Sequence, residues 1–147
     1  TALREASQKK AQFALVYVDL DNFKPINDQY GHYAGDKVLK VTAQRLREVL
    51  RNTDLASRIG GDEFALILHG IQKRSDIDLA MNKMLYTLAI PIDIGGQDVV
   101  VNASAGVAIF PQDSRDMTAL CRLADSAMYL AKEKRNTFCY HSPLQGG

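Results

Sequence analysis

The sequence has almost no excess charge of either sign. Its 18 Lys and Arg residues nearly balance 17 Asp and Glu residues, and the formal net charge is +1. A field this weak does not draw a protein onto nucleic acid or an anionic membrane. We therefore expect no nucleic-acid partner and no membrane contact for this domain. Any phosphate binding must come from a local site.

Cysteines and long apolar runs are also scarce. Cys121 and Cys139 are the only cysteines and lack the spacing of metal ligands. They suit a reducing compartment, and a single disulfide between them is the alternative. No apolar run reaches the roughly 18 residues that span a bilayer, and we find no signal peptide. The chain starts at Thr1 on a polar stretch typical of the outer half of a helix, so we expect a fragment of a longer protein.

The hydrophobic pattern predicts one domain over residues 1–147, because we find no repeat, low-complexity tract or linker. A continuous apolar run over 13–20 predicts a buried central strand. Asp21, Asn22 and Pro25 then lead into a helix, with Pro25 in its first turn. Further strands are expected at 55–59, 64–68, 90–94, 98–101, 105–110 and 137–140, and helices over 35–51 and from about 76 to 88. A last helix should bury Met117, Leu120, Cys121, Ala124, Ala127, Met128 and Ala131.

The tetrapeptide Gly60-Gly61-Asp62-Glu63 separates two short strands and predicts a hairpin turn. A hairpin requires an antiparallel pair, which excludes a simple doubly wound parallel sheet. We therefore expect an α/β (α+β) fold in which helices flank a central, mostly antiparallel sheet, of the ferredoxin-like or polymerase-palm kind.

This topology would bring acidic residues together. Asp19 ends the central strand, and Asp62 and Glu63 lie at the hairpin. A single acid at a strand end is typically just solvated. Acids on adjacent strand ends can instead hold Mg²⁺, which prefers a few carboxylates plus substrate phosphates. The glycines before Asp62 would let backbone approach a ligand closely.

Three blocks of sequence resemble the GGDEF family of diguanylate cyclases. They are residues 19–36 (DLDNFKPINDQYGHYAGD), 58–64 (RIGGDEF) and 124–132 (ADSAMYLAK). Their order and spacing match the family across nearly the whole chain. The resemblance implies an enzyme that condenses two GTP molecules into cyclic di-GMP and two pyrophosphates. It also implies two divalent metal ions, Mg²⁺ or Mn²⁺, in each active half-site.

The resemblance assigns the metal ligands as Asp19, the backbone carbonyl of Leu20, and Asp62. Asp62 is also the candidate proton acceptor from the ribose 3′-hydroxyl, and Glu63 would support the same region. The division of the proton transfer between Asp62 and Glu63 stays open. The Lys24 ammonium would stabilise charge that develops on phosphate.

The remaining substrate contacts also follow from the resemblance. The amides of Asn22, Phe23 and Lys24 would bind the terminal phosphates, Asn27 and Asp36 would recognise guanine, His32 would make a further substrate contact, and Lys132 and Arg135 would contact the β- and γ-phosphates. The family commonly has a glycine and one more residue before this arginine. Lys134 is therefore the alternative to Arg135. Without the motif, His32 and Lys24 would be interpreted as ordinary surface residues.

Arg51 and Asp54 have the RxxD spacing of the family's inhibitory product site, at the usual distance before the hairpin. An arginine and an aspartate three residues apart at a helix end are often only a surface ion pair. The position relative to Gly60 favours the product site. Arginine can grip guanine or phosphate in a fork, and aspartate can accept from guanine.

Each domain would hold one GTP, so the resemblance implies that two copies must meet as a homodimer for catalysis. The family's segment before this region, with its Leu-Thr-Gly-Leu-like turn and Asn-Arg-Arg sequence, is absent here. We expect a cytoplasmic bacterial domain whose parent carries any sensor or membrane anchor in missing segments. The alternatives are a non-catalytic module that binds GTP or cyclic di-GMP, and a mononucleotide cyclase. The complete motif disfavours the first, and Asn27 and RxxD disfavour the second.

Overall fold

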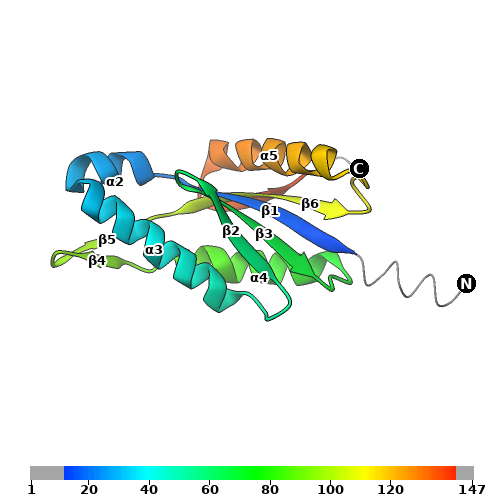
Figure 1. Cartoon of the computed structure of the whole chain (residues 1–147), viewed down its shortest axis with the longest axis horizontal. Coiled ribbons are helices and arrows are strands. Elements are labelled where there is room, and N and C mark those ends of the chain that lie inside the picture. The colour runs from blue at the N-terminus through cyan, green and yellow to red at the C-terminus, as the bar shows by residue number, and fades with distance from the viewer. Residues whose placement is uncertain (1–11, 142–147) are drawn as a thin grey trace, which may run out of the picture.

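The first predicted strand becomes the centre of a five-stranded sheet in the computed structural model, which describes residues 12–141 (Figure 1). Strand β1 pairs antiparallel with both of its neighbours, and the pair β6–β7 is the parallel exception. This confirms the predicted mostly antiparallel sheet. The strand order is β2 (Leu55–Gly60), β3 (Glu63–His69), β1 (Phe13–Leu20), β6 (Ala103–Phe110) and β7 (Thr137–Tyr140).

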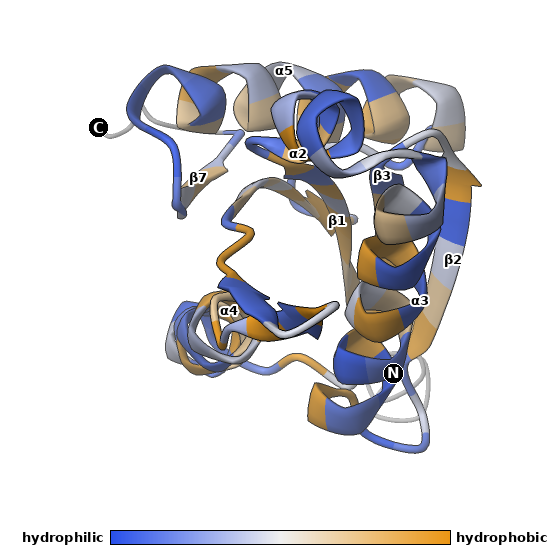
Figure 2. Cartoon of the chain, turned by 90° about the vertical axis from the view of Figure 1, so that its left-hand side faces the viewer, coloured by the Kyte–Doolittle hydropathy of each residue, from blue (hydrophilic) through white to orange (hydrophobic). Residues whose placement is uncertain are grey.

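Four helices in the described part of the chain flank this sheet: α2 (Phe23–Tyr30), α3 (His32–Val49), α4 (Arg74–Leu88) and α5 (Met117–Lys134). Helix α5 covers one face, and α3 and α4 cover the other, as the end-on view of Figure 2 shows. A short separate hairpin joins β4 (Ile92–Ile94) to β5 (Gln97–Val99). Within residues 12–141, no helix combines the length and apolarity that crossing a membrane requires.

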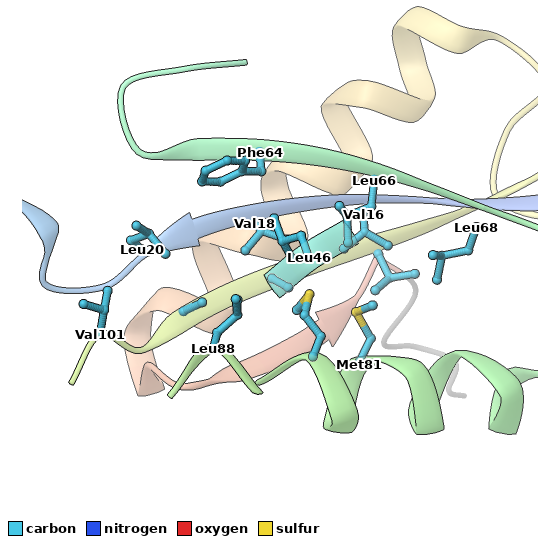
Figure 3. Packing of buried hydrophobic residues seen from close by; sticks show 14 of the residues in the cluster. Val16, Val18, Leu20, Leu46, Phe64, Leu66, Leu68, Met81, Leu88 and Val101 are labelled. Carbon is cyan, nitrogen blue, oxygen red and sulfur yellow. The ribbon is translucent and has the colours of Figure 1, made fainter. Parts of the chain in front are cut away.

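The larger hydrophobic core lies between the sheet and the pair α3–α4 (Figure 3). There Val16 and Phe64 of the sheet pack with Leu46 of α3 and Met81 of α4. A smaller core under α5 contains Leu15. Alternate residues of β1 therefore face two cores, which explains why its sequence is apolar without interruption.

Helix α5 lies very close to the sheet at Gly106 of β6. A Cβ atom at this position would be 2.1 Å from the Met128 backbone nitrogen and 2.2 Å from the Ala124 carbonyl oxygen. Only glycine permits this approach. The close packing sets the height of the last turns of α5 above the end of β1.

The predicted helix over 35–51 has different limits, because α3 begins at His32 and ends at Val49. Gly31, with φ of 94°, separates it from α2, which contains Pro25 in its first turn as predicted. Gly60 and Glu63 belong to their strands, so the hairpin turn is shorter than the predicted tetrapeptide. The predicted strand over 98–101 is β5, which ends at Val99.

Four further predictions changed or fall outside the described residues. Met117 was expected on the buried face of the last helix but is exposed at its first turn. Ile90 is exposed before β4, which starts at Ile92. Cys121 and Cys139 are both free, so the disulfide alternative is wrong. The helix expected at the start of the chain lies outside the described residues.

Candidate active site

The acids that the sequence predicts to converge do meet at one end of the sheet. Asp19 is paired directly with Glu63 across β1 and β3. The next amide, that of Leu20, donates to the Asp62 carbonyl at 3.2 Å. Antiparallel pairing therefore fixes Asp19 beside the hairpin, with its side chain on the face of the sheet that α5 covers.

Asp19 has an unusual electrostatic environment. Its side chain is only 15% exposed, and its Oδ1 atom is buried without a hydrogen-bond partner. Burial raises the pKa of the Asp19 carboxyl to about 6, and the nearby charge of Asp62 adds to the rise, while Lys132 opposes it. The carboxylate is therefore short of positive partners despite one lysine neighbour.

Lys132, in the last turn of α5, reaches across to the end of β1. Its Nζ lies 3.2 Å from Asp19 Oδ2 and donates to the Leu20 carbonyl oxygen at 3.1 Å. The prediction placed Lys132 near phosphates, whereas its contacts in this structure include two of the atoms expected to bind metal. Lys134 and Arg135 are both exposed just beyond, so the choice between them stays open.

The oxygen atoms at this edge fit a hard divalent cation. They comprise the Asp19 carboxylate with its unpartnered Oδ1 and the Leu20 carbonyl, with the Asp62 carboxylate close enough for its charge to act on Asp19. Among residues 12–141, no group of three or more His, Cys, Asp or Glu side chains is arranged as a complete metal site. A divalent cation held by few protein ligands would need further oxygen atoms, such as those of substrate phosphates, to complete its coordination.

A cleft of about 290 Å³ opens beside these acids, between the sheet and α5. Of its α5 wall, only Lys132 was anticipated from the sequence. Helical spacing of Asp125, Tyr129 and Lys132 could have indicated that they share one side of the helix. The cleft is lined by Asp19, Glu63, Asp125, Met128, Tyr129 and Lys132.

The proposed phosphate-binding amides lie where α2 begins. A helix start leaves its first N–H groups without intrahelical partners, so the amides of Phe23 and Lys24 are available to an anion. Asn22 precedes them and donates from Nδ2 to the Val100 carbonyl at 3.2 Å, whereas its Oδ1 is buried without a partner. Lys24 is exposed.

The proposed guanine-binding residues lie on consecutive helices. Gly35 packs against Asn27: a Cβ on Gly35 would lie 2.1 Å from Asn27 Oδ1. Asn27 is thus held beside Gly35 in the first turn of α3, and Gly35 directly precedes Asp36 in the chain. A cavity of about 660 Å³ between α3 and the β4–β5 hairpin includes Asp36 in its lining but not Asn27. His32 is exposed at the start of α3.

Arg51 and Asp54 form the ion pair that was the simpler interpretation of RxxD. Arg51 Nε lies 3.2 Å from Asp54 Oδ2, and the His69 amide donates to Asp54 Oδ1 at 3.0 Å. Burial alone would raise the pKa of Asp54, but these hydrogen bonds outweigh it and hold the pKa below its usual value. Asp54 is 4% exposed and Arg51 is 59% exposed, so Arg51 alone presents much surface to a ligand.

The comparisons with known proteins agree with this geometry. The family model described as "Diguanylate cyclase, GGDEF domain" matches residues 1–137. The diguanylate cyclase TpbB of Pseudomonas aeruginosa is 40% identical over 134 residues, which are 90% of this chain and 31% of TpbB. The cyclic di-GMP phosphodiesterase PdeR of Escherichia coli is 38% identical over 143 residues, which are 97% of this chain and 21% of PdeR.

A solved structure that comprises only the GGDEF domain of P. aeruginosa TpbB has the same fold. It superposes with a TM-score of 0.88 at 37% identity and covers 96% of this chain and 83% of that chain. The chain spans less than a third of the length of full TpbB or PdeR. Sequence and structure agree on one assignment: the chain belongs to the GGDEF family of diguanylate cyclase domains.

Proposed function

We propose that this domain is a diguanylate cyclase that condenses two GTP molecules into cyclic di-GMP and two pyrophosphates. The observation that carries the proposal is the pairing of Asp19 with Glu63 next to Asp62, with an unpartnered carboxylate oxygen beside a cleft. Family membership supports the same chemistry. Because GTP is a cytoplasmic nucleotide and the named relatives are bacterial, we place the reaction in a bacterial cytoplasm.

Each domain would bind one GTP through the residues described above. Asn27 and Asp36 would recognise guanine, the amides at the start of α2 would bind the terminal phosphates, and Lys24 would balance their charge. Asp19, Asp62 and the Leu20 carbonyl would hold two Mg²⁺ or Mn²⁺ ions. When bound, these ions would lower the pKa of the ribose hydroxyl and neutralise phosphate charge.

The bond changes require a second copy of the domain. The 3′-oxygen of one GTP attacks the α-phosphorus of the nucleotide on the partner, and the bond from that phosphorus to the pyrophosphate oxygen breaks. Asp62 accepts the hydroxyl proton, with Glu63 as the alternative acceptor. Two such events close the ring, so a homodimer that brings two nucleotides face to face is part of the proposal.

Mass spectrometry of the product tests the proposal. Wild-type domain, fused to a dimeric coiled coil so that encounter is not limiting, is incubated with GTP and Mg²⁺. We expect cyclic di-GMP from wild type and none from Asp62→Ala, with unchanged folding by circular dichroism. Product formation by Asp62→Ala at the wild-type rate would refute the assigned role.

A non-catalytic module that binds GTP or cyclic di-GMP is the second candidate. The match to PdeR, which is named a phosphodiesterase, favours it, because a GGDEF domain also occurs in a protein of that other activity. The same incubation separates the two. Tight GTP binding without any cyclic di-GMP would support the module and exclude the enzyme.

We also propose that Arg51 contributes to an inhibitory site for cyclic di-GMP. Its exposed guanidinium lies beside a cavity of about 230 Å³, lined partly by Asp54, Leu79 and Lys83. Asp54 is occupied by Arg51 and His69. Asp54 would therefore orient the Arg51 side chain, unless binding of cyclic di-GMP breaks the ion pair between them.

A further inference from the structure

Asp21, immediately after β1, has a buried carboxylate that the proposed reaction does not use. Its side chain is 3% exposed. Oδ1 accepts from the Ser104 hydroxyl at 2.5 Å and lies 3.5 Å from Lys132 Nζ, and Oδ2 accepts from the Asn136 amide at 2.8 Å. Protein donors thus engage both oxygens. Asp19, two residues earlier, instead keeps one oxygen unpartnered.

These bonds connect the end of β1 to two segments that are distant from it in sequence, β6 and the end of α5 with the turn that follows. Ser104 lies on β6 and is fully buried, Lys132 lies in the last turn of α5, and Asn136 lies in the turn from α5 to β7. In that turn, Arg135 has φ of 64° and Asn136 has φ of 50°, a region that side chains other than glycine rarely occupy. The bond from the Asn136 amide therefore holds Arg135 in a conformation that it would not favour alone.

We propose that Asp21 is a positioning residue for the triphosphate and not a metal ligand. This inference rests on the proposed function. Lys132 has a long, flexible side chain, and the carboxylates of Asp19 and Asp21, at 3.2 and 3.5 Å from its ammonium, restrict where it points. Asp21 thereby keeps the Lys132 ammonium at the edge of the cleft and fixes the backbone from which Arg135 projects.

The variant Asp21→Asn tests the inference because it keeps the shape and removes the charge. Calorimetry would use 3′-deoxy-GTP, which lacks the attacking hydroxyl, and GMP, which lacks the β- and γ-phosphates, both with Mg²⁺. We expect about 10-fold weaker binding of 3′-deoxy-GTP, as is typical when a supporting partner is lost. GMP affinity should stay unchanged. A similar loss for GMP would overturn the inference, since the defect would then be general.

A double-mutant cycle with Lys132→Met shows whether Asp21 acts through this lysine. If it does, adding Asp21→Asn to Lys132→Met weakens 3′-deoxy-GTP binding much less than 10-fold. Fully additive losses would contradict the inference and would favour a direct metal or structural role. Absence of 3′-deoxy-GTP binding by wild type would also overturn it.

Two further variants keep the test decisive if Asp21→Asn folds poorly. Ser104→Ala removes one of the bonds to Asp21 and should weaken 3′-deoxy-GTP binding about threefold, again without affecting GMP. Asp113→Asn is the matched control, because its carboxylate accepts from the Ile109 amide at 2.7 Å at the other end of β6. It should change neither affinity. These measurements need no turnover, so a wild type that binds as expected but forms no cyclic di-GMP refutes the enzyme proposal alone.

Discussion

The substitution Asp19→Asn should make the metal-free domain more stable at neutral pH while removing a proposed metal ligand. Burial and the charge of Asp62 raise the pKa of Asp19 from its ordinary 3.8 to about 6. The protonated form therefore suits the folded state better than the carboxylate does. This preference contributes its full stabilising free energy to the folded state below pH 3.8, and the contribution is lost as the pH rises through about 6. At pH 7.5, wild type carries the whole penalty.

The size of the effect follows from the same values. A rise from 3.8 to about 6 corresponds to about 3 kcal/mol. We reduce this to about 1–2 kcal/mol, because solvent reaches both Asp19 and its 28% exposed partner Lys132 and screens their charges. Lys132 would keep the Leu20 carbonyl and Asp21 as neighbours in the variant. Loss of its contact with Asp19 should therefore offset little of the gain.

Urea unfolding in EDTA at pH 7.5 and pH 5.0 measures the effect. Asp19→Asn should exceed wild type by about 1–2 kcal/mol at pH 7.5 and by about half of that at pH 5.0. Asp54→Asn is the control of opposite sign: the pKa of Asp54 is lowered, so its carboxylate stabilises the fold at neutral pH and the variant should be less stable there. Adding Mg²⁺ should stabilise wild type more than Asp19→Asn. Equal or lower stability of Asp19→Asn at pH 7.5 would refute the reasoning.

Three other predictions concern packing, base choice and feedback. Gly106→Ala should lower the free energy of unfolding in urea by at least about 3 kcal/mol, because its Cβ would overlap the backbone of α5. Wild type should bind GTP far better than ATP in calorimetry, since adenine lacks the N1 and N2 hydrogen-bond donors of guanine from which Asp36 would accept. The substitution Asn27→Ala should reduce this preference for GTP. Arg51→Ala should relieve inhibition by added cyclic di-GMP in a turnover assay without changing GTP affinity. Equal inhibition of both proteins would place the product at the active site instead.

Much of the fold could be predicted because its signals are local. The uninterrupted apolar run of β1 reflects burial on both faces, and Gly61 allows the tight turn between β2 and β3. The start of α3 was predicted late, because the apolar pattern first becomes clear at Val38, whereas the helix begins directly after Gly31. The first turn of α3 buries only the small residues Ala34 and Gly35, which give no clear apolar pattern. Met117 was misplaced for the opposite reason, because it is apolar and fits the helical spacing but lies exposed in the first turn of α5.

The candidate site was predictable only as far as strand pairing determines it. Asp19 and Glu63 had to meet once β1 and β3 were paired. The contacts of Lys132 could not be foreseen, because its long side chain has many rotamers. The charges that favour one of them, on Asp19 and Asp21, are more than 100 residues away in sequence. The pairing of Arg51 with Asp54 was foreseen as an alternative, but the part played by the His69 amide depends on where β3 ends.

The distinction between the two acids of Asp19-Leu20-Asp21 shows what only the structure can supply. Asp19 lies next to the last residue of β1, and Asp21 directly follows the strand. The family resemblance selects Asp19 as a metal ligand, but residue type alone does not say why Asp21 should differ. Folding satisfies Asp21 with donors from two segments but leaves Asp19 Oδ1 buried without a partner. A buried acceptor of this kind is costly unless a donor or a cation reaches it. The free-energy cost of an unpaired buried oxygen therefore falls on Asp19, which a bound cation could neutralise. Asp21, whose oxygens are already hydrogen-bonded, can instead act as a rigid support.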